Sequence, residues 1–150
     1  MSLTDWQANG WLKPHATSKE EINNLLRIVE RDLSDSIVSG LSADWQFGIA
    51  YNAALKLCTI ALYTQGYRPE NSLAHYRTIA SLKEIPERNW SQYAAYLNAC
   101  RIRRNTLEYD RADIITSDEA NNLITFTKTF LFEIKLYLAD FFPEYVSNAQ

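Results

Sequence analysis

The segment SADWQFGIAYNAALKLCTIALYTQG, residues 42–66, decides the fold of this chain. Drawn as a helix, it carries apolar side chains on nearly every side, and a helix of that kind lies at the centre of a bundle. Ser42 is a typical helix-starting residue and Gly66 a typical stop. The sequence therefore predicts a central helix from Ser42 to about Gln65.

A narrow polar strip interrupts this apolar surface. It consists of four residues at helical spacing, Asn52, Lys56, Thr59 and Tyr63. Two interpretations are open. The strip faces solvent, or it faces a later helix that is rich in arginine.

A helix before the central one is predicted from a capping box, in which Ser18 is followed three residues later by Glu21. Apolar residues then recur at helical spacing as far as Ile37. Gly40 is expected to end this helix, and a short connection leads into the central one.

Three more helices are predicted after the central one. The sequence Gly66-Tyr67-Arg68-Pro69 indicates a turn, after which Asn71 or Ser72 caps a shorter helix that runs to Ile85. A long helix follows from Trp90 to Glu108.

The last helix starts at a second capping box, Thr116 with Glu119, and ends at Phe142-Pro143. No segment shows the alternation typical of a strand. The expected fold is all-α, an up-and-down bundle of four long helices plus one short helix. It occupies residues 18–142, between an N-terminal arm (1–17) that packs Trp6 and Trp11 on the body or on a second subunit, and a C-terminal tail (143–150).

The composition limits the classes of function. A net charge of −3 argues against a chain-wide electrostatic grip on nucleic acid, although a local basic patch remains compatible with it. The longest uncharged stretches are much shorter than the ~20 residues of a membrane helix, and no signal peptide is visible, so we expect a soluble cytoplasmic protein with no membrane contact. The two cysteines are expected to be buried thiols, and no metal or cofactor is expected.

The stretch ACRIRRNTLEYD, residues 99–110, is the main functional candidate. On a regular helix Arg101, Arg104, Asn105 and Glu108 share one face. One interpretation is an ion pair between Arg104 and Glu108 on a solvated face. The other is a phosphate site, because the planar guanidinium offers a fork of N–H donors.

Three segments resemble the HEPN superfamily: Tyr51-Asn52-Ala53-Ala54, the turn Gly66-Tyr67-Arg68-Pro69, and Arg104-Asn105-Thr106-Leu107-Glu108-Tyr109-Asp110. The resemblance extends over roughly 42–138. It implies a helical bundle that often forms homodimers. Many members are metal-independent ribonucleases of toxin–antitoxin systems, phage defence and RNA processing, and others bind RNA, nucleotides or a partner nucleotidyltransferase without catalysis.

The family's active motif is an arginine followed four to six residues later by a histidine. Arg104 matches the arginine and Asn105 the polar residue that often follows it, whereas Tyr109 stands in place of the histidine. Tyrosine, with an ordinary pKa near 10, is a poor base at neutral pH, and losing acid–base catalysis costs ~10²–10⁴ in rate. Arg104 and Tyr109 are the catalytic candidates if the protein is a metal-independent endoribonuclease.

The remaining candidates follow from the same motif. Arg101, Arg104 and Asn105 are the candidate RNA phosphate ligands, and Asn52, Glu108 and Asp110 are candidate supporting residues.

Three hypotheses are open. The protein binds RNA phosphate with weak or absent ribonuclease activity; it is a dimerisation or partner-binding module for a nucleotidyltransferase-type protein; or it binds a small anionic or nucleotide ligand. His75, early in the short helix, is a weaker candidate: it is either a catalytic residue or a structural or merely exposed side chain.

Overall fold

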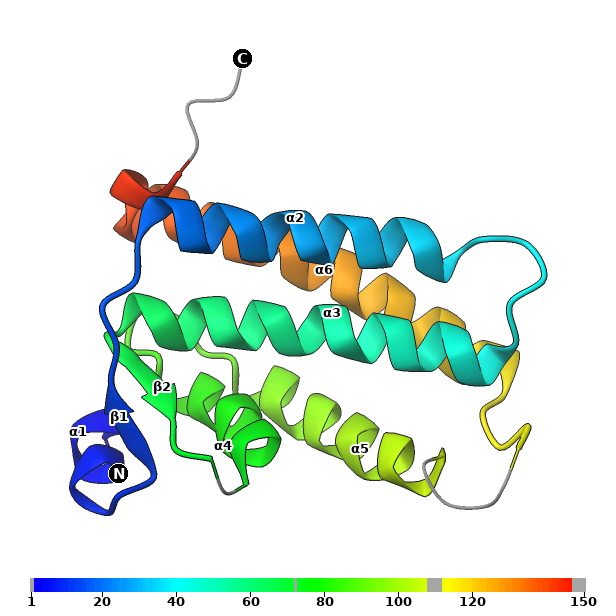
Figure 1. Ribbon diagram of the computed structural model, residues 1–150, viewed down its shortest axis with the longest axis horizontal. Helices are drawn as coiled ribbons and strands as arrows, with labels where there is room; N and C mark the ends of the chain where they lie inside the picture. The colour runs from blue at the N-terminus through cyan, green and yellow to red at the C-terminus, as the bar shows by residue number, and fades with distance from the viewer. Residues whose placement is uncertain (1, 72, 108–111, 147–150) are drawn as a thin grey trace.

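The long helices of this protein pack side by side and alternate in direction (Figure 1). The structure, a computed structural model, describes residues 2–71, 73–107 and 112–146, and of residues 106 and 107 it describes the backbone. The four long helices are α2 (Lys19–Ser36), α3 (Ala43–Thr64), α5 (Ser91–Leu107) and α6 (Ser117–Phe141). The predicted all-α bundle is therefore confirmed.

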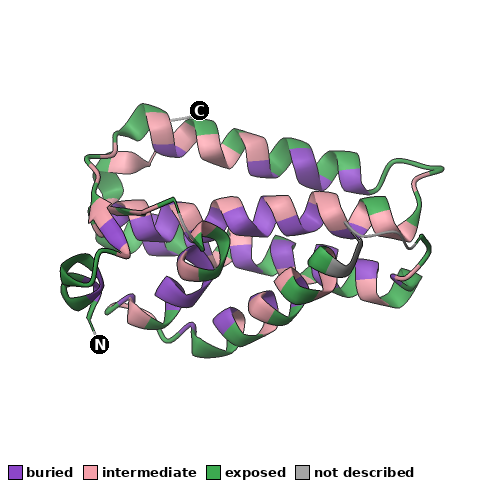
Figure 2. Cartoon of the chain, turned by 60° about the horizontal axis from the view of Figure 1, so that its bottom comes forward, coloured by how far each residue is buried: buried purple, intermediate pink, exposed green. Residues whose placement is uncertain are grey.

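Helix α3 is the central element, as its apolar composition predicts. It packs against α2, α5 and α6, so nearly every side of it is covered (Figures 1 and 2). Ser42 caps its start by accepting a hydrogen bond from the amide of Trp45 at 3.1 Å. At its end Gly66 has φ +86°, a left-handed conformation in which glycine is favoured over residues with a Cβ. Both predicted boundaries of this helix are confirmed.

The ends of the outer helices agree less closely with prediction. The hydroxyl of Ser18 accepts from the amide of Glu21, but the Glu21 carboxylate binds His15 and Thr17 instead of completing a capping box. Helix α2 ends at Ser36, earlier than the glycine stop at Gly40 predicts. The capping box of Thr116 with Glu119 at the start of α6 is confirmed.

Aromatic rings fill the space between α5 and α6. Tyr93 meets Phe126 and Phe130 edge-on, with ring centres 5.0 and 5.2 Å apart, and Trp90 meets Phe130 and Tyr137 in the same way. Edge-to-face contacts of this kind add ~0.5–1.5 kcal/mol each to the burial of the rings. These aromatic residues thus serve the core.

Two short strands contradict the expectation of a chain without strands. Strand β1 (Leu12–Pro14) pairs antiparallel with β2 (Tyr67–Pro69), so the segment predicted as a plain turn is part of a two-stranded sheet. Helix α1 (Leu3–Ala8) precedes β1 and buries Leu3 and Trp6. The N-terminal segment packs on the body, with Trp11 partly buried beside it.

The short helix after β2 is smaller than predicted. Helix α4 (Ala74–Ala80) continues as the 3₁₀ helix η1 (Ser81–Glu84), and the chain turns at Ile85. Its N-cap is Leu73, in the left-handed region with φ 55°, and no side-chain cap hydrogen bond is present, so the predicted cap by Asn71 is wrong. The alternative cap, Ser72, lies outside the described residues. A second 3₁₀ helix, η2 (Pro143–Tyr145), follows α6 and packs against α2.

None of the helices in the described part of the chain has both the length and the apolar character needed to cross a membrane.

Candidate functional site

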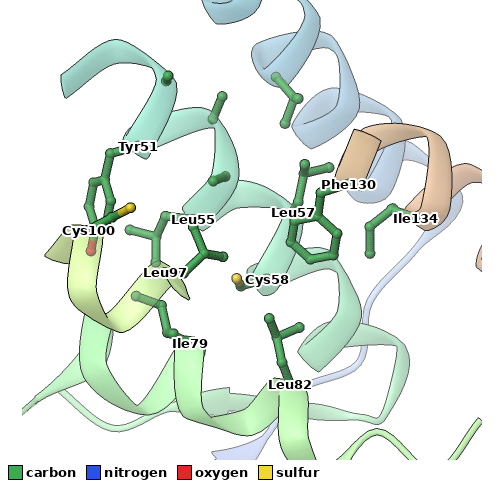
Figure 3. Close-up of a cluster of buried hydrophobic side chains, with 14 of the residues drawn as sticks. Tyr51, Leu55, Leu57, Cys58, Ile79, Leu82, Leu97, Cys100, Phe130 and Ile134 are labelled. Atoms are coloured by element: carbon green, nitrogen blue, oxygen red, sulfur yellow. The ribbon is translucent and has the colours of Figure 1, made fainter. Parts of the chain in front are cut away.

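Helices α3, α4 with η1, and α5 present rows of core residues to one another (Figure 3). On α3 the row is Tyr51, Leu55 and Cys58, one helical turn apart and all buried. On α4 and η1 it is Ile79 and Leu82, and on α5 it is Leu97 and Cys100.

Helical spacing continues two of these rows into polar side chains. His75 lies one turn before Ile79, and Arg104 lies one turn after Cys100. Both therefore reach the end of the core that Tyr51 closes. If the two rows stayed apolar, these positions would carry core side chains instead of a histidine and an arginine.

Arg104 lies over the face of Tyr51, with its guanidinium carbon 5.3 Å from the ring centre. Tyr51 is only 1% exposed, and its hydroxyl has no hydrogen-bond partner among the described residues. Burial raises the pKa of Tyr51 to about 12, although the positive charges of Arg104 and Arg101 act in the opposite direction. The phenol is therefore neutral at physiological pH and offers its ring face to the cation.

His75 approaches the same tyrosine from α4. Its ring centre is 6.2 Å from that of Tyr51, and the side chain is exposed. Arg104 and His75 thus contact one ring from two different helices. The separation between the guanidinium carbon of Arg104 and the ring centre of His75 is therefore at most the sum of their distances from the Tyr51 ring centre.

A second stacked pair lies beside the first. The guanidinium carbon of Arg101 is 5.3 Å from the ring centre of Tyr76, and Arg101 Nε donates to Asn98 Oδ1 at 3.0 Å. Because Arg101 and Arg104 are three residues apart, they are neighbours on α5. We name the set Tyr51, His75, Tyr76, Arg101 and Arg104 the arginine–tyrosine cluster.

A groove of about 140 Å³ continues from this cluster between α4–η1 and α5. Tyr76 lies at the junction, since it belongs both to the cluster and to the lining of the groove. Small side chains, including Ala94 and Ala95, form part of its floor, and Lys83 supplies a cation along it. The groove is thus flanked by positive charge and bordered by an exposed aromatic ring.

Arg103, between the two stacked arginines, has a different role. Its Nε donates to Glu119 Oε2 at 2.9 Å and its Nη2 to Oε1 at 3.0 Å, while Nη2 also donates to the carbonyl of Ile114 at 2.9 Å. Hydrogen bonds from Arg103 and from the Thr116 cap lower the pKa of Glu119 to about 2. Arg103 therefore ties α5 to the start of α6.

Asn52 does not belong to the arginine site. Its Nδ2 donates to Asp32 Oδ2 of α2 at 2.9 Å, and its Oδ1 accepts from Lys56 Nζ at 3.4 Å. Farther along the same strip, Tyr63 meets His15 with ring centres 4.3 Å apart. The interpretation of this strip as facing the arginine-rich helix is wrong, because the rotation of α3 turns it toward α2 and the N-terminal segment.

The other sequence candidates divide into two groups. Asn105 is exposed on the last turns of α5. Glu108, Tyr109 and Asp110 lie outside the described residues, and with them the predicted Arg104–Glu108 ion pair and the Arg104–Tyr109 pairing.

The sequence pointed less clearly to the residues that surround the arginines. Tyr51 occurs in one of the HEPN-like segments, but the motif itself does not assign it to a site, and nothing in the sequence assigns Tyr76 to one. The feature that could have identified them is the position of each tyrosine at the end of a row of apolar residues, with an arginine at the end of a row on another helix. Within the described ranges, no group of three or more His, Cys, Asp or Glu residues could hold a metal ion.

Comparison of the chain with protein-family models, with curated proteins and with solved structures finds no match.

Proposed function

We propose that this protein is a HEPN-like RNA-associated domain that binds RNA phosphate through Arg101 and Arg104, has weak or absent ribonuclease activity, and acts in a toxin–antitoxin or defence system. The observation that carries the proposal is the pair of arginines that lie over the rings of Tyr51 and Tyr76, the second of which also lines the α4–α5 groove. The resemblance of the sequence around Arg104 to the HEPN motif supports the same conclusion.

Stacking favours phosphate binding for a geometric reason. A ring holds a guanidinium by its flat face, whereas phosphate is bound by the N–H groups in the guanidinium plane. An arginine positioned in this way loses less side-chain entropy when it takes up a phosphate than a mobile one does. Both Arg101 and Arg104 are partly buried, in keeping with such positioning.

The surroundings favour single-stranded RNA over a duplex. Tyr76 is 43% exposed, so part of its ring is available for contact with a base. Base–aromatic stacking with cations along the backbone is how proteins bind single strands. The net charge of −3 opposes binding over a large surface, so the contact is expected to involve only a few phosphates.

The test is the affinity of the protein for a fluorescent, mixed-sequence single-stranded RNA, measured by anisotropy over a range of salt concentrations. Arg104→Ala should weaken binding about ten- to a hundredfold, since a charge-assisted hydrogen bond contributes ~1.5–3 kcal/mol. It should also reduce the salt dependence, by about 0.7 in the slope of log affinity against log salt for each lost phosphate contact. The RNA affinity of Arg104→Lys should lie between those of the wild type and Arg104→Ala, because lysine keeps the charge but lacks the fork of N–H donors.

Arg88→Ala is the matched control. Arg88 also lies over aromatic rings, those of Tyr137 and Phe141, but it precedes the first turn of α5 and so lies far from Arg104 along that helix. An equal loss of affinity in this control and in Arg104→Ala would refute a local site. Failure of the wild type to bind RNA would refute the proposed function.

Self-association is part of the proposal, with the partner a second copy of the chain. Ile37, Val38 and Trp45 are 55–67% exposed at the connection between α2 and α3. Asp44, beside Trp45, accepts hydrogen bonds from the amides of Asp113 and Ile115, so this apolar surface and the connection after α5 lie at one end of the bundle. A second copy on this surface would bring two arginine-bearing ends together.

A further inference from the structure

We infer that His75 supplies the proton-transfer group for slow, metal-independent RNA cleavage beside Arg104, in place of the motif histidine that Tyr109 replaces. The inference rests on the proposed function and names the residue that would carry any cleavage. Its basis is the convergence of α4 and α5 on Tyr51, which brings an imidazole and a guanidinium to one ring.

The two side chains have complementary chemistry. Cleavage within an RNA strand needs a group that takes the proton from a ribose 2′-hydroxyl and a cation that offsets the charge on the phosphate. An imidazole can accept and release a proton near neutral pH, which a neutral phenol does poorly. In this structure His75 provides the imidazole and Arg104 the cation.

The reaction balances without any cofactor. The 2′-oxygen attacks the adjacent phosphorus, the bond from phosphorus to the 5′-oxygen breaks, and the products carry a 2′,3′-cyclic phosphate and a 5′-hydroxyl. His75 accepts the proton of the 2′-hydroxyl and later returns it to solvent, while solvent protonates the leaving 5′-oxygen. Arg104 stabilises the additional negative charge on the phosphate oxygens.

The position of His75 also fits the path of a strand. His75 and Tyr76 are consecutive residues on α4, and Tyr76 leads into the groove along α5. The exposed position of His75 means that its replacement removes little packing.

The chain offers a matched control, since it contains two histidines. His15 also lies against a tyrosine, with its ring centre 4.3 Å from that of Tyr63, but it is on the N-terminal segment and bonded to Glu21 at 2.7 Å. Both histidines thus contact a tyrosine ring, but the ring that His75 contacts is the one over which Arg104 lies.

The experiment is gel-based cleavage of a mixed RNA pool in EDTA by the full chain, with RNA affinity measured in parallel. The wild type should cut slowly and produce cyclic phosphate ends. It should not cut a pool in which every ribose is replaced by 2′-deoxyribose. His75→Ala should lose about a hundredfold or more in rate with RNA affinity unchanged, His15→Ala should keep the wild-type rate, and added imidazole should partly restore His75→Ala.

Two results would overturn the inference while the proposed function stands: RNA binding with no cleavage by the wild type, or equal cleavage by the wild type and His75→Ala. A loss of RNA binding in His75→Ala would also count against it, since that result assigns His75 to binding alone. Absence of RNA binding by the wild type would refute the proposed function itself. Thermal unfolding of each variant identifies any loss that comes from the fold.

Discussion

Arg103 of α5 and Glu119 of α6 form a two-bond ion pair, with N–O distances of 2.9 and 3.0 Å, directly beside the stacked Arg104. Two consecutive arginines therefore have opposite roles. One fixes the position of α6 relative to α5, and the other lies over Tyr51 in the candidate site.

Replacement of these two arginines should separate stability from binding. Arg103→Ala should lower the free energy of unfolding by about 1 kcal/mol, because it removes a two-bond pair and a bond to the carbonyl of Ile114 next to the α6 cap. RNA affinity should change little. Arg104→Ala should leave the free energy of unfolding nearly unchanged in urea and should weaken RNA binding measured by anisotropy. If Arg104→Ala destabilises the protein and Arg103→Ala does not, Arg104 is the structural residue.

The Arg103–Glu119 pair also predicts an acid-dependent loss of stability. The pKa of Glu119 falls from 4.5 to about 2 on folding, so its contribution is fully present above pH 4.5 and is lost as the pH falls toward 2. Urea unfolding of the wild type and of Glu119→Gln at a series of pH values measures it. The difference between the two proteins should shrink on acidification, and a constant difference would contradict this assignment.

Tyr51→Phe should leave the fold as stable as the wild type or slightly more so. The Tyr51 hydroxyl is buried with no partner among the described residues, and removing such a group relieves a desolvation cost of order 1 kcal/mol. The ring under Arg104 is retained, so RNA affinity should be unchanged. Tyr51→Leu is the contrasting variant, since it removes the ring and should weaken RNA binding.

Tyr109→His should increase metal-independent cleavage. The substitution restores the arginine–histidine spacing of the HEPN motif from Arg104 and adds a group able to transfer protons near neutral pH. The assay compares wild type, Tyr109→His, and Tyr109→His with Arg104→Ala in EDTA. Brisk cleavage by the wild type that Tyr109→Phe abolishes would instead make the tyrosine catalytic.

Light scattering at micromolar concentration should give twice the monomer mass of 17.3 kDa. Trp45→Ser should shift the protein toward the monomer, because Trp45 is 67% exposed within the apolar surface at the α2–α3 connection. Phe132→Ser, at a similarly exposed apolar residue of α6, is the matched control. A clean wild-type monomer would contradict the dimer.

The central helix could be predicted from sequence because its information is local. Ser42, the run of apolar residues and Gly66 each specify one property of α3, and all three agree with the structure. The β1–β2 pairing could not be found in this way. Each strand has three residues and ends in a proline, so neither is long enough to show a period of two, and their pairing joins segments far apart in the chain.

The candidate site was predicted only in part for a related reason. Spacing places Arg101 and Arg104 on one face of α5, but it does not say which helix that face meets. The rotation of α3 decides that Tyr51 meets Arg104 and that its neighbour Asn52 meets Asp32. Such a rotation depends on the packing of the whole bundle, and a single residue step changes the partner.

The pairing of β1 with β2 limits how far this protein can be trimmed. Helix α4 carries His75 and Tyr76 yet has only seven residues, fewer than a helix needs to persist alone in water. Strand β2 lies just before α4 in the chain, and Arg77 of α4 stacks on Trp11 with its guanidinium carbon 4.8 Å from the ring centre. A fragment beginning at Lys19 would keep α4 but lose both of its supports, the β1–β2 pairing and the contact with Trp11. A fragment that keeps α4 in place therefore needs at least Trp11 and strand β1 as well as the helices.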